Sequence, residues 1–338
     1  MRALRKLQPG EGHVELIEAD RRVPGHGEVL LDILATGICG TDLHLVDGVH
    51  PAQTPVTLGH EFVGRIAETG PGAGAWQPGD RVVCEPHFRA CRTCGLCRRG
   101  LAQHCKAKGA PGIVFDGALA DHAAVPAWLL HRVPDSLDDV AAALCEPTAI
   151  SVTAVERAGV EPGEDVVVLG PGAIGLLSAM VARAAGANSV VVAGRASSAA
   201  RLAVAQELGF ETWDSEGGDV LDRASALGRG LGADVVIDTT GSAVSLALRL
   251  ARRRGRVCAL GLHGPGGVEI PWDVAMFQAV DLSFSMSSSY TSWDRALTLL
   301  ASGAVDAKPL ITVFPLAEWD RAFTAVRSRE AIKAVITP

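Results

Sequence analysis

Two kinds of hydrophobic pattern divide the chain near residue 148. Before that point, short segments with loosely alternating hydrophobic and polar residues are separated by turns rich in glycine, proline and aspartate. This pattern of short alternating segments and turns is typical of a partly open all-β domain. The predicted strands there are residues 27–35, 63–68 and 81–84.

From residue 165 onward, short continuous hydrophobic runs alternate with helical patterns. Such runs are expected of parallel strands that are covered on both faces, and their alternation with helices indicates βαβ units. The sequence therefore predicts an α/β domain with a doubly wound parallel sheet. The predicted strands are 165–169, 189–193, 234–238 and 256–260, and the predicted helices are 173–185, 201–208 and 244–252.

After about residue 287 the pattern changes again, to helices at 293–301 and 317–327 with short strands around them. We expect this tail to fold back onto the first domain. A chain of 338 residues is long enough for two domains. The predicted first domain is therefore 1–149 with 287–338, and the predicted second domain is 150–286.

Composition and charge narrow the class of protein. A hydrophobic share of 48% with 20% charged residues excludes disorder, and a net charge of −7 disfavours nucleic acid as a partner. No run of about 18 apolar residues predicts a membrane span, and the N-terminus lacks the apolar core of a signal peptide. Eight cysteines in such a chain favour a reducing, cytoplasmic compartment, where thiols bind metals or do chemistry.

A glycine-rich turn lies between the predicted strand 165–169 and the predicted helix 173–185. Gly170, Gly172 and Gly175 fit the pattern G-x-G-x-x-G, which brings a pyrophosphate to a helix N-terminus. The alternative is a tight βα turn without a ligand, which the flanking strand and helix make less favourable. The predicted cofactor-binding residues are Gly170, Gly172, Ala173, Ile174, Gly175, Gly194, Arg195, Arg201 and Gly261.

The end of the second strand bears on the choice of cofactor. NAD enzymes usually carry an acidic residue there for the adenosine ribose, and this chain has Ala193, Gly194 and Arg195 instead. An arginine can bind the 2′-phosphate of NADP, or it can simply face solvent. The sequence therefore favours NADP over NAD.

Four cysteines lie within fifteen residues, at Cys91, Cys94, Cys97 and Cys105. This spacing fits one tetrahedral Zn²⁺, and a closed four-thiolate site is structural because it leaves no position for a substrate. An iron–sulfur cluster or disulfides are alternatives that compartment and spacing disfavour. We expect a structural zinc lobe at about residues 86–108.

A second set of metal-binding residue types is dispersed. Cys39 starts the run Cys-Gly-Thr-Asp-Leu-His, His60 and Glu61 are adjacent, and Glu146 follows Cys145. Each residue alone is more often a core residue than a ligand. Together they offer thiolate, imidazole and carboxylate, the mixed set that an open catalytic zinc prefers.

These motifs resemble those of the zinc-containing medium-chain alcohol and polyol dehydrogenases, in the branch of sorbitol (L-iditol) and threonine dehydrogenases. The resemblance covers essentially the whole chain, including the closing residues 331–338. It implies a GroES-like, partly open β-barrel as catalytic domain, combined with a Rossmann domain. It also implies a homo-oligomer, either a dimer or a tetramer.

The resemblance further implies roles for the second set. Cys39, His60 and Glu146 would be ligands of a catalytic zinc, and Glu61 would ligate it or stand behind it. Cys145 could replace Glu146 as ligand, although the motif favours the carboxylate. With the lobe, this gives two zinc ions per chain.

Neighbouring residues would support the reaction. Asp42 would accept from the N–H of His60. Thr41 would take the proton of the substrate hydroxyl and pass it through cofactor hydroxyls to His44, from which it reaches water.

The implied activity is hydride transfer between a secondary alcohol and NAD(P). The predicted substrate pocket is lined by Phe88, Phe115, Ser288 and Tyr290. Sorbitol dehydrogenases carry an Arg-Tyr pair near this last position, where this chain has serines before Tyr290. That departure puts sorbitol in doubt and leaves room for a cationic polyhydroxylated substrate, such as an aminocyclitol or an amino sugar. The alternatives are an NADPH-dependent ketone or aldehyde reductase and a non-catalytic zinc-lobe protein.

Overall fold

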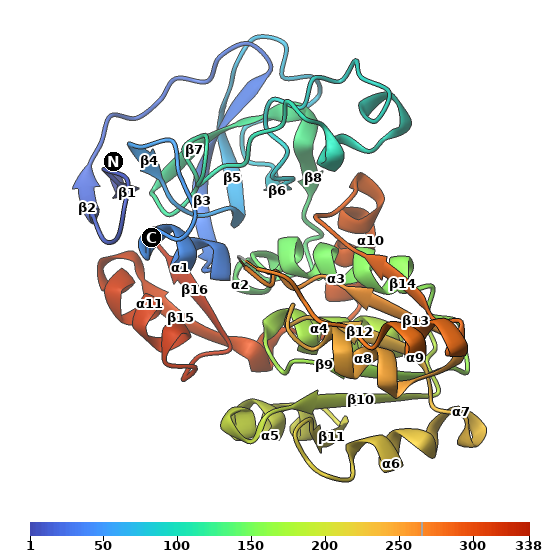
Figure 1. Cartoon of the computed structure of the whole chain (residues 1–338). Coiled ribbons are helices and arrows are strands. Elements are labelled where there is room, and N and C mark those ends of the chain that lie inside the picture. Colours follow the sequence, from blue (N-terminus) through green and yellow to red (C-terminus); the bar gives the residue numbers. More distant parts are fainter. Residues whose placement is uncertain (265) are drawn as a thin grey trace. The chain divides into compact units, whose positions relative to one another are not determined.

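The computed structural model describes residues 1–264 and 266–338 and divides into two compact units (Figure 1). Unit 1 contains both ends of the chain. The sequence predicts domain boundaries at 149/150 and 286/287, and the structure divides after Glu146 and after Ser288. Unit 1 consists of Met1–Glu146, Ser289–Ala301 and Leu310–Pro338, and unit 2 of Pro147–Ser288 and Ser302–Pro309.

Unit 1 is built on a seven-stranded sheet around β3 (Glu28–Gly37). The strand order is β15-β16-β3-β5-β6-β8, and β7 also pairs with β3. The C-terminal strand β16 (Lys333–Thr337) pairs with β3 through Val335 opposite Gly37, so the tail completes the sheet of the first segment. The other strands are β5 (Glu61–Thr69), β6 (Arg81–Cys84), β7 (His122–Pro126), β8 (Leu130–Arg132) and β15 (Ile311–Pro315).

A smaller sheet and four α-helices complete unit 1, and a further helix begins at its boundary with unit 2. Its hydrophobic residues form two clusters, one inside the large sheet around Leu31 and Phe62, and one around Leu4, Ile38 and Phe323. The small sheet has the order β2-β1-β4, with β1 (Arg2–Lys6), β2 (Val14–Glu18) and β4 (Val56–Thr57). The helices are α1 (Gly40–Val46), α2 (Asp139–Ala142), α3 (Cys145–Ala158, which continues into unit 2), α10 (Tyr290–Ala301) and α11 (Trp319–Arg327).

Unit 2 is a six-stranded parallel sheet in the order β11-β10-β9-β12-β13-β14. Numbered within the unit this is 3-2-1-4-5-6, the order of a dinucleotide-binding fold. The central strands are buried almost throughout, because helices cover both faces, and the predicted doubly wound sheet is confirmed (Figure 1). The strands are β9 (Asp165–Leu169), β10 (Ser189–Gly194), β11 (Glu211–Asp214), β12 (Ala233–Asp238), β13 (Ala251–Ala259) and β14 (Asp281–Phe284).

The helices of unit 2 correct one sequence prediction. The helical pattern at 244–252 ends at Leu250, and Ala251 already pairs with Ala233 as part of a nine-residue strand. The run of arginines that follows has no helical or alternating hydrophobic pattern, and the pairing with β12 decides its conformation. The helices are α4 (Ala173–Ala184), α5 (Ala199–Glu207), α6 (Val220–Ser225), α7 (Leu227–Gly230), α8 (Val244–Leu250) and α9 (Trp272–Gln278).

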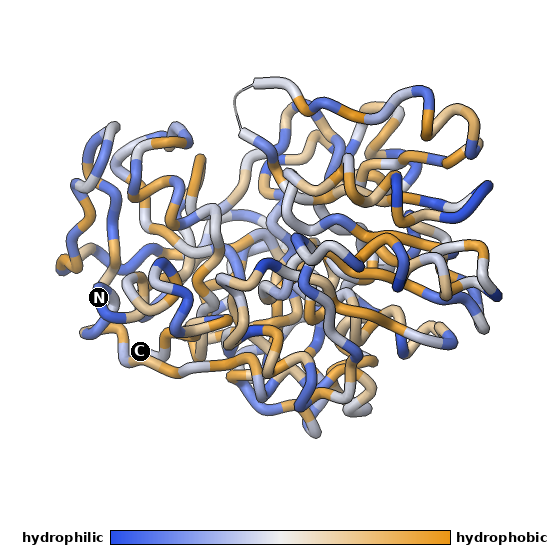
Figure 2. The backbone as a smooth tube through the Cα atoms, turned by 60° about the horizontal axis from the view of Figure 1, so that its bottom comes forward, coloured by the Kyte–Doolittle hydropathy of each residue, from blue (hydrophilic) through white to orange (hydrophobic). Residues whose placement is uncertain are grey.

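Hydrophobic and hydrophilic residues alternate at short intervals along the tube in Figure 2. Within the described residues, none of the helices has the length and apolar character that crossing a membrane requires.

Candidate functional site

The start of α1 positions the first candidate ligand. Cys39 is the N-cap residue of α1, and its N–H donates to Asp42 Oδ2 at 2.9 Å. The other oxygen of Asp42 accepts from the N–H of Gly59 at 3.3 Å, which ties the helix to the segment before His60. Asp42 is fully buried, and burial raises the pKa of its carboxyl. The helix start therefore holds Cys39 and His60 in one neighbourhood.

Cys39, His60 and Glu61 form a cluster of possible ligands, with one ligand atom of each within 4.8 Å of the others. His60 Nδ1 lies 3.8 Å from Asp42 Oδ1, which is too long for a hydrogen bond, and it has no hydrogen-bond partner among the described residues. Burial opposes charge on His60, but Cys39 and Asp42 outweigh burial and hold the pKa of His60 well above its ordinary value. Thiolate, imidazole and carboxylate are ligands of Zn²⁺, so the three residues fit a metal ion.

Lys333 contacts the cluster through Glu61, although the sequence predicts no role for this lysine. Its ammonium forms an ion pair with Glu61 Oε2 and donates to the carbonyl oxygen of Ile38 at 3.0 Å. Burial disfavours the charge, but Glu61 raises the pKa of Lys333 above its ordinary value. Gly37 makes room for this pair, because a Cβ there would overlap the Glu61 carboxylate. The only sequence signal was a single lysine in the apolar run 331–336.

Glu146 lies near this cluster but outside the group of three. It is buried, and burial together with the carboxylate of Glu61 raises its pKa to about 7. Its charge also interacts with His60 and Lys333. The neighbouring Cys145 is fully buried, and burial together with Glu146 raises the pKa of that thiol well above its ordinary value.

Thr41 and His44 lie three residues apart on α1, a spacing that places them on one helix face. Thr41 Oγ1 is 3.7 Å from Cys39 Sγ, at the edge of the cluster. The His44 ring is exposed and lies 5.1 Å from the ring of His50. A hydroxyl next to the cluster is thus followed, one turn along, by an imidazole at the surface.

The four cysteines of the predicted lobe are also brought together. Cys91 Sγ lies 3.6 Å from Cys105 Sγ and 4.0 Å from Cys97 Sγ, and all four sulfurs lie within 4.8 Å of one another. Zinc–sulfur bonds of about 2.3 Å in a tetrahedron place sulfurs about 3.8 Å apart, so the lobe fits a zinc ion. All eight cysteines, each within the described residues, are free. N–H groups of the loop, that of Cys94 first, lower the pKa of Cys91 to about 6.

The glycine-rich turn in unit 2 has the geometry of a phosphate cradle. Gly170 has φ +103°, and a Cβ there would lie 2.7 Å from Thr239 Oγ1. A Cβ on Gly175 would overlap the carbonyl oxygen of Gly170, so α4 packs directly on the turn. Gly172 caps α4, and a Cβ on it would meet nothing within 4 Å. The N-terminus of α4 is therefore open to a bound anion.

The remaining predicted cofactor residues lie around the same sheet end. Gly194 ends β10 against Pro171, and Gly261 follows β13 against Gly241. Arg195 forms an ion pair with Glu216 at 3.4 Å, and both side chains are 63% exposed. Arg201 lies near the start of α5.

The predicted pocket residues lie in different environments. Phe88 is buried in the core of the large sheet, with its ring 5.9 Å from that of the half-buried Phe115. Ser288 is fully buried. Tyr290, the first residue of α10, is 55% exposed.

Comparison with known proteins gives consistent matches over the whole chain. Residues 25–135 match the alcohol dehydrogenase GroES-like domain family, and residues 173–302 match the zinc-binding dehydrogenase family. Sorbitol dehydrogenase of Halalkalibacterium halodurans is 35% identical over 100% of this chain and 99% of its own. L-threonine 3-dehydrogenase of Pyrococcus horikoshii is 34% identical over 99% and 98%. A zinc-binding dehydrogenase from Sinorhizobium meliloti, solved with bound NADP, superposes with a TM-score of 0.92 at 33% identity, covering 100% and 99%.

Proposed function

Because the chain belongs to the zinc-containing medium-chain alcohol and polyol dehydrogenases, we propose that it oxidises a secondary alcohol of a polyol, sugar or aminocyclitol with NAD(P). The observation that carries the proposal is the cluster of Cys39, His60 and Glu61 with the Thr41 hydroxyl beside it. The predicted family, fold class and enzyme class are confirmed by the comparisons, and named enzymes at this identity leave no support for a non-catalytic protein.

Cys39, His60 and Glu146 would hold a catalytic zinc ion, with Glu61 beside it. Bound there, zinc supplies Lewis acidity that favours ionisation of an alcohol near neutral pH. Thr41 Oγ1 would accept the hydroxyl proton, and His44 would exchange it with water at the surface. Lys333 holds the Glu61 carboxylate in place through their ion pair. The lobe of Cys91, Cys94, Cys97 and Cys105 would hold a second zinc ion, so metal analysis should give about two per chain.

The substrate proposal rests on the start of α10. Tyr290 follows serines where sorbitol dehydrogenases carry an arginine before their tyrosine, so a cationic amine would not meet the charge of that arginine. The test is a panel of D-sorbitol, xylitol, simple alcohols, and an inosamine paired with the matching inositol. Reduction of NAD or NADP is followed by absorbance. We expect oxidation of polyhydroxylated substrates, with the inosamine preferred over the inositol.

The panel also separates the alternatives. If both zinc sites are filled and no alcohol reduces either cofactor, the proposal is wrong. If only ketones or aldehydes react, with NADPH as donor, the reductase alternative replaces it. Equal rates with the inosamine and the inositol would refute the preference for a cation.

NADP preference is a further proposal, supported by the missing acidic residue at the end of β10 and by Arg195. Among the residues that the structure describes, the ion-pair partner of Arg195 is the exposed carboxylate of Glu216, so binding a phosphate there would break only a weak, solvent-screened pair. Arg195→Gln should raise the KM for NADP about tenfold and leave the KM for NAD within about twofold, because only NADP has the 2′-phosphate. Arg253→Gln, an exposed arginine elsewhere in unit 2, is the control. Equal changes for both cofactors would contradict the assignment.

A homo-oligomer is proposed from the edge of the unit 2 sheet. Strand β14 is the last strand in the order, and within residues 1–264 and 266–338 it has a strand partner on one side only. Large hydrophobic side chains around this strand are exposed. An edge strand with free backbone groups and exposed hydrophobic side chains can pair with the same strand of a second copy. These residues are Trp272, Met276, Phe277, Phe284 and Met286.

Phe284→Lys is expected to shift the protein from dimer or tetramer toward monomer, because an edge lysine opposes pairing. Phe284 is 67% exposed in the isolated chain, so the change should not disturb the core. Light scattering coupled to size-exclusion chromatography measures the mass directly. Val313→Lys, an exposed position on β15, is the control. A wild-type monomer, or an unchanged oligomer in Phe284→Lys, would rule out this interface.

We also propose a cytoplasmic location. The proposal is supported by the four lobe thiols, whose metal-binding arrangement requires reduced cysteines.

A further inference from the structure

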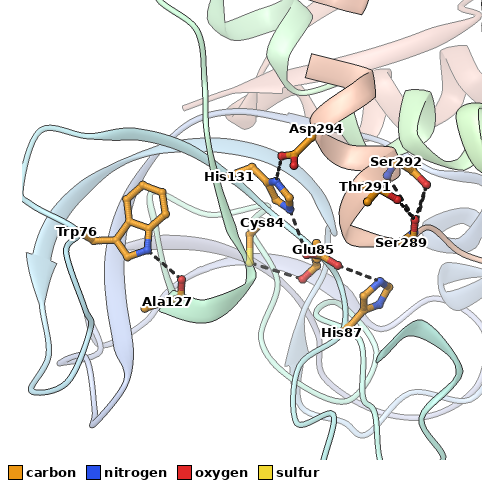
Figure 3. Close-up of polar contacts among 10 residues, drawn as sticks. All are labelled: Trp76, Cys84, Glu85, His87, Ala127, His131, Ser289, Thr291, Ser292 and Asp294. Carbon is orange, nitrogen blue, oxygen red and sulfur yellow. Dashed lines mark hydrogen bonds and ion pairs between the residues drawn. The ribbon is translucent and has the colours of Figure 1, made fainter. Parts of the chain in front are cut away.

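A buried polar cluster in unit 1 lies outside the proposed metal sites (Figure 3). Glu85 directly follows β6, His131 is in the middle of β8, and Asp294 is on α10. His131 Nε2 lies 3.1 Å from Glu85 Oε1, and His131 Nδ1 lies 2.8 Å from Asp294 Oδ1. His131 and Glu85 are buried, while the side chain of Asp294 is 52% exposed. The three residues thus link two strands of the sheet to α10.

Both contacts of His131 are made to oxygens that accept hydrogen bonds. Each ring nitrogen of His131 therefore faces one carboxylate oxygen at hydrogen-bond distance, and the ring bridges Glu85 and Asp294. His87 Nε2 lies 3.6 Å from the second oxygen of Glu85. A buried carboxylate is thus matched by nearby imidazoles, which the burial of charge requires.

Aromatic contacts fix the same ring against α10. The centroid of His131 lies 4.6 Å from that of Tyr290 and 5.7 Å from that of Trp293. Trp293 is buried, and Tyr290 is half exposed. His131 therefore contacts the first turn of α10 through two rings and one hydrogen bond, and these contacts restrict where Tyr290 can lie.

Hydrogen bonds between neighbouring side chains also hold the first turn of α10. Ser289 Oγ lies 2.7 Å from Ser292 Oγ and 3.0 Å from Thr291 Oγ1, as Figure 3 shows. A turn that is ordered internally moves as one body. Its attachment through Asp294 and the two rings then sets the position of the Tyr290 side chain as well.

We propose that His131 is a positioning residue: held between Glu85 and Asp294, it fixes the first turn of α10 so that the Tyr290 hydroxyl is presented to a polyhydroxylated substrate. This inference rests on the proposed function, because it takes Tyr290 as a substrate contact. His131 acts through Tyr290 and touches neither the reacting atoms nor the metal ligands, so it should affect substrate affinity and leave the chemical step unchanged.

Two substitutions at the half-exposed Asp294 test the link without removing a core side chain. Asp294→Ala removes the acceptor. Asp294→Asn keeps the contact, because its amide can accept from or donate to Nδ1 of His131. With D-sorbitol as substrate we expect Asp294→Ala to raise KM about tenfold with kcat within about twofold, and Asp294→Asn to stay within about twofold of wild type in both. The KM for NADP should not change in either variant.

Tyr290 is the only tyrosine of the chain, which gives a second readout that needs no turnover. Protein labelled with 3-fluorotyrosine has one ¹⁹F resonance, and its shift reports the contact of the Tyr290 ring with the tilted ring of His131. We expect this resonance to move or broaden in Asp294→Ala and to stay in place in Asp294→Asn. His131→Phe keeps an aromatic ring but no donor, and it should behave like Asp294→Ala.

The control is Arg132→Gln on the next residue of β8, which breaks an exposed ion pair with Asp80 and should change neither readout. The proposal is wrong if Asp294→Ala leaves both the resonance and KM unchanged, or if Asp294→Asn is as damaging as Asp294→Ala. A general loss of thermal stability, kcat and cofactor affinity in Asp294→Ala would show a purely structural role. If the wild-type protein oxidises no polyol, the proposed function is wrong. The positioning role of His131 is tested separately, because an unmoved ¹⁹F resonance in Asp294→Ala would contradict it without any measurement of turnover.

Discussion

Cys39→Ser is expected to lower kcat by about 10³-fold or more while the fold and NADP binding persist. Serine is a much poorer zinc ligand than a thiolate, and Cys39 is the one thiolate in the cluster with His60 and Glu61. Without the metal, no group in this cluster can favour ionisation of the alcohol near neutral pH. Turnover of the best polyol, zinc content and NADP affinity are measured on the same preparation.

The zinc content of Cys39→Ser should fall from about two ions per chain to about one, because the lobe keeps its four thiols. Cys258→Ser is the matched control: that thiol lies in β13 of unit 2, buried and outside both ligand groups. It should keep both ions and nearly full activity. Full activity of the metal-depleted Cys39→Ser variant would contradict the assignment of the active site.

The second large effect is expected in the cysteine lobe. Cys105→Ser should remove the structural zinc and lower the melting temperature by about 10 °C. Metal binding to such a site contributes several kcal/mol to the free energy of unfolding. In a folding unit of about 150–250 residues, each 1 kcal/mol shifts Tm by about 2–4 °C. The lobe between Phe88 and Gly109, which pair as an isolated bridge, has little other regular structure than two short 3₁₀ turns. Differential scanning calorimetry with zinc analysis provides the measurement.

The control for the lobe is Arg98→Ala, an exposed residue between the same cysteines. It should keep two zinc ions and the wild-type melting temperature. The two cysteine variants should also differ from each other. Cys39→Ser should lose activity with little change in Tm, whereas the main effect of Cys105→Ser should be a lower Tm. If Cys105→Ser melts like wild type, the lobe does not depend on a metal ion.

The local motifs could be predicted from the sequence because each is short and its geometry follows from neighbouring residues. The turn at Gly170, Gly172 and Gly175 sits where its pattern predicts, between β9 and α4. The lobe cysteines lie within fifteen residues, and local turns of this segment, which include two short 3₁₀ turns, bring their sulfurs within 4.8 Å of one another. The four central strands of unit 2 were predicted because a strand buried on both faces is hydrophobic throughout, whereas the edge strands β11 and β14 were not.

Other elements escaped prediction because their residues carry no hydrophobic period. The start of β13 is a run of arginines that becomes a strand only by pairing with β12. Phe88 is 5% exposed and packs in the core of the large sheet, and its place in the substrate pocket stays a prediction. An aromatic residue in a loop has the same appearance in a sequence whether it faces a core or a ligand.

The sequence by itself determined the two-domain α/β architecture and the types of residue available for zinc and dinucleotide binding, because these depend on composition and on spacing within one segment. The family followed from the resemblance of its motifs to those of known dehydrogenases, which the comparisons confirm. The tertiary structure alone decided which distant residues meet. Lys333 reaches Glu61 because β16 pairs with β3, and Asp294 reaches His131 because α10 packs near β8. Such contacts join residues far apart in the chain, and the sequence does not show which residues a charged side chain will contact. The partner is decided on folding, because a buried charged group is unfavourable unless it is paired.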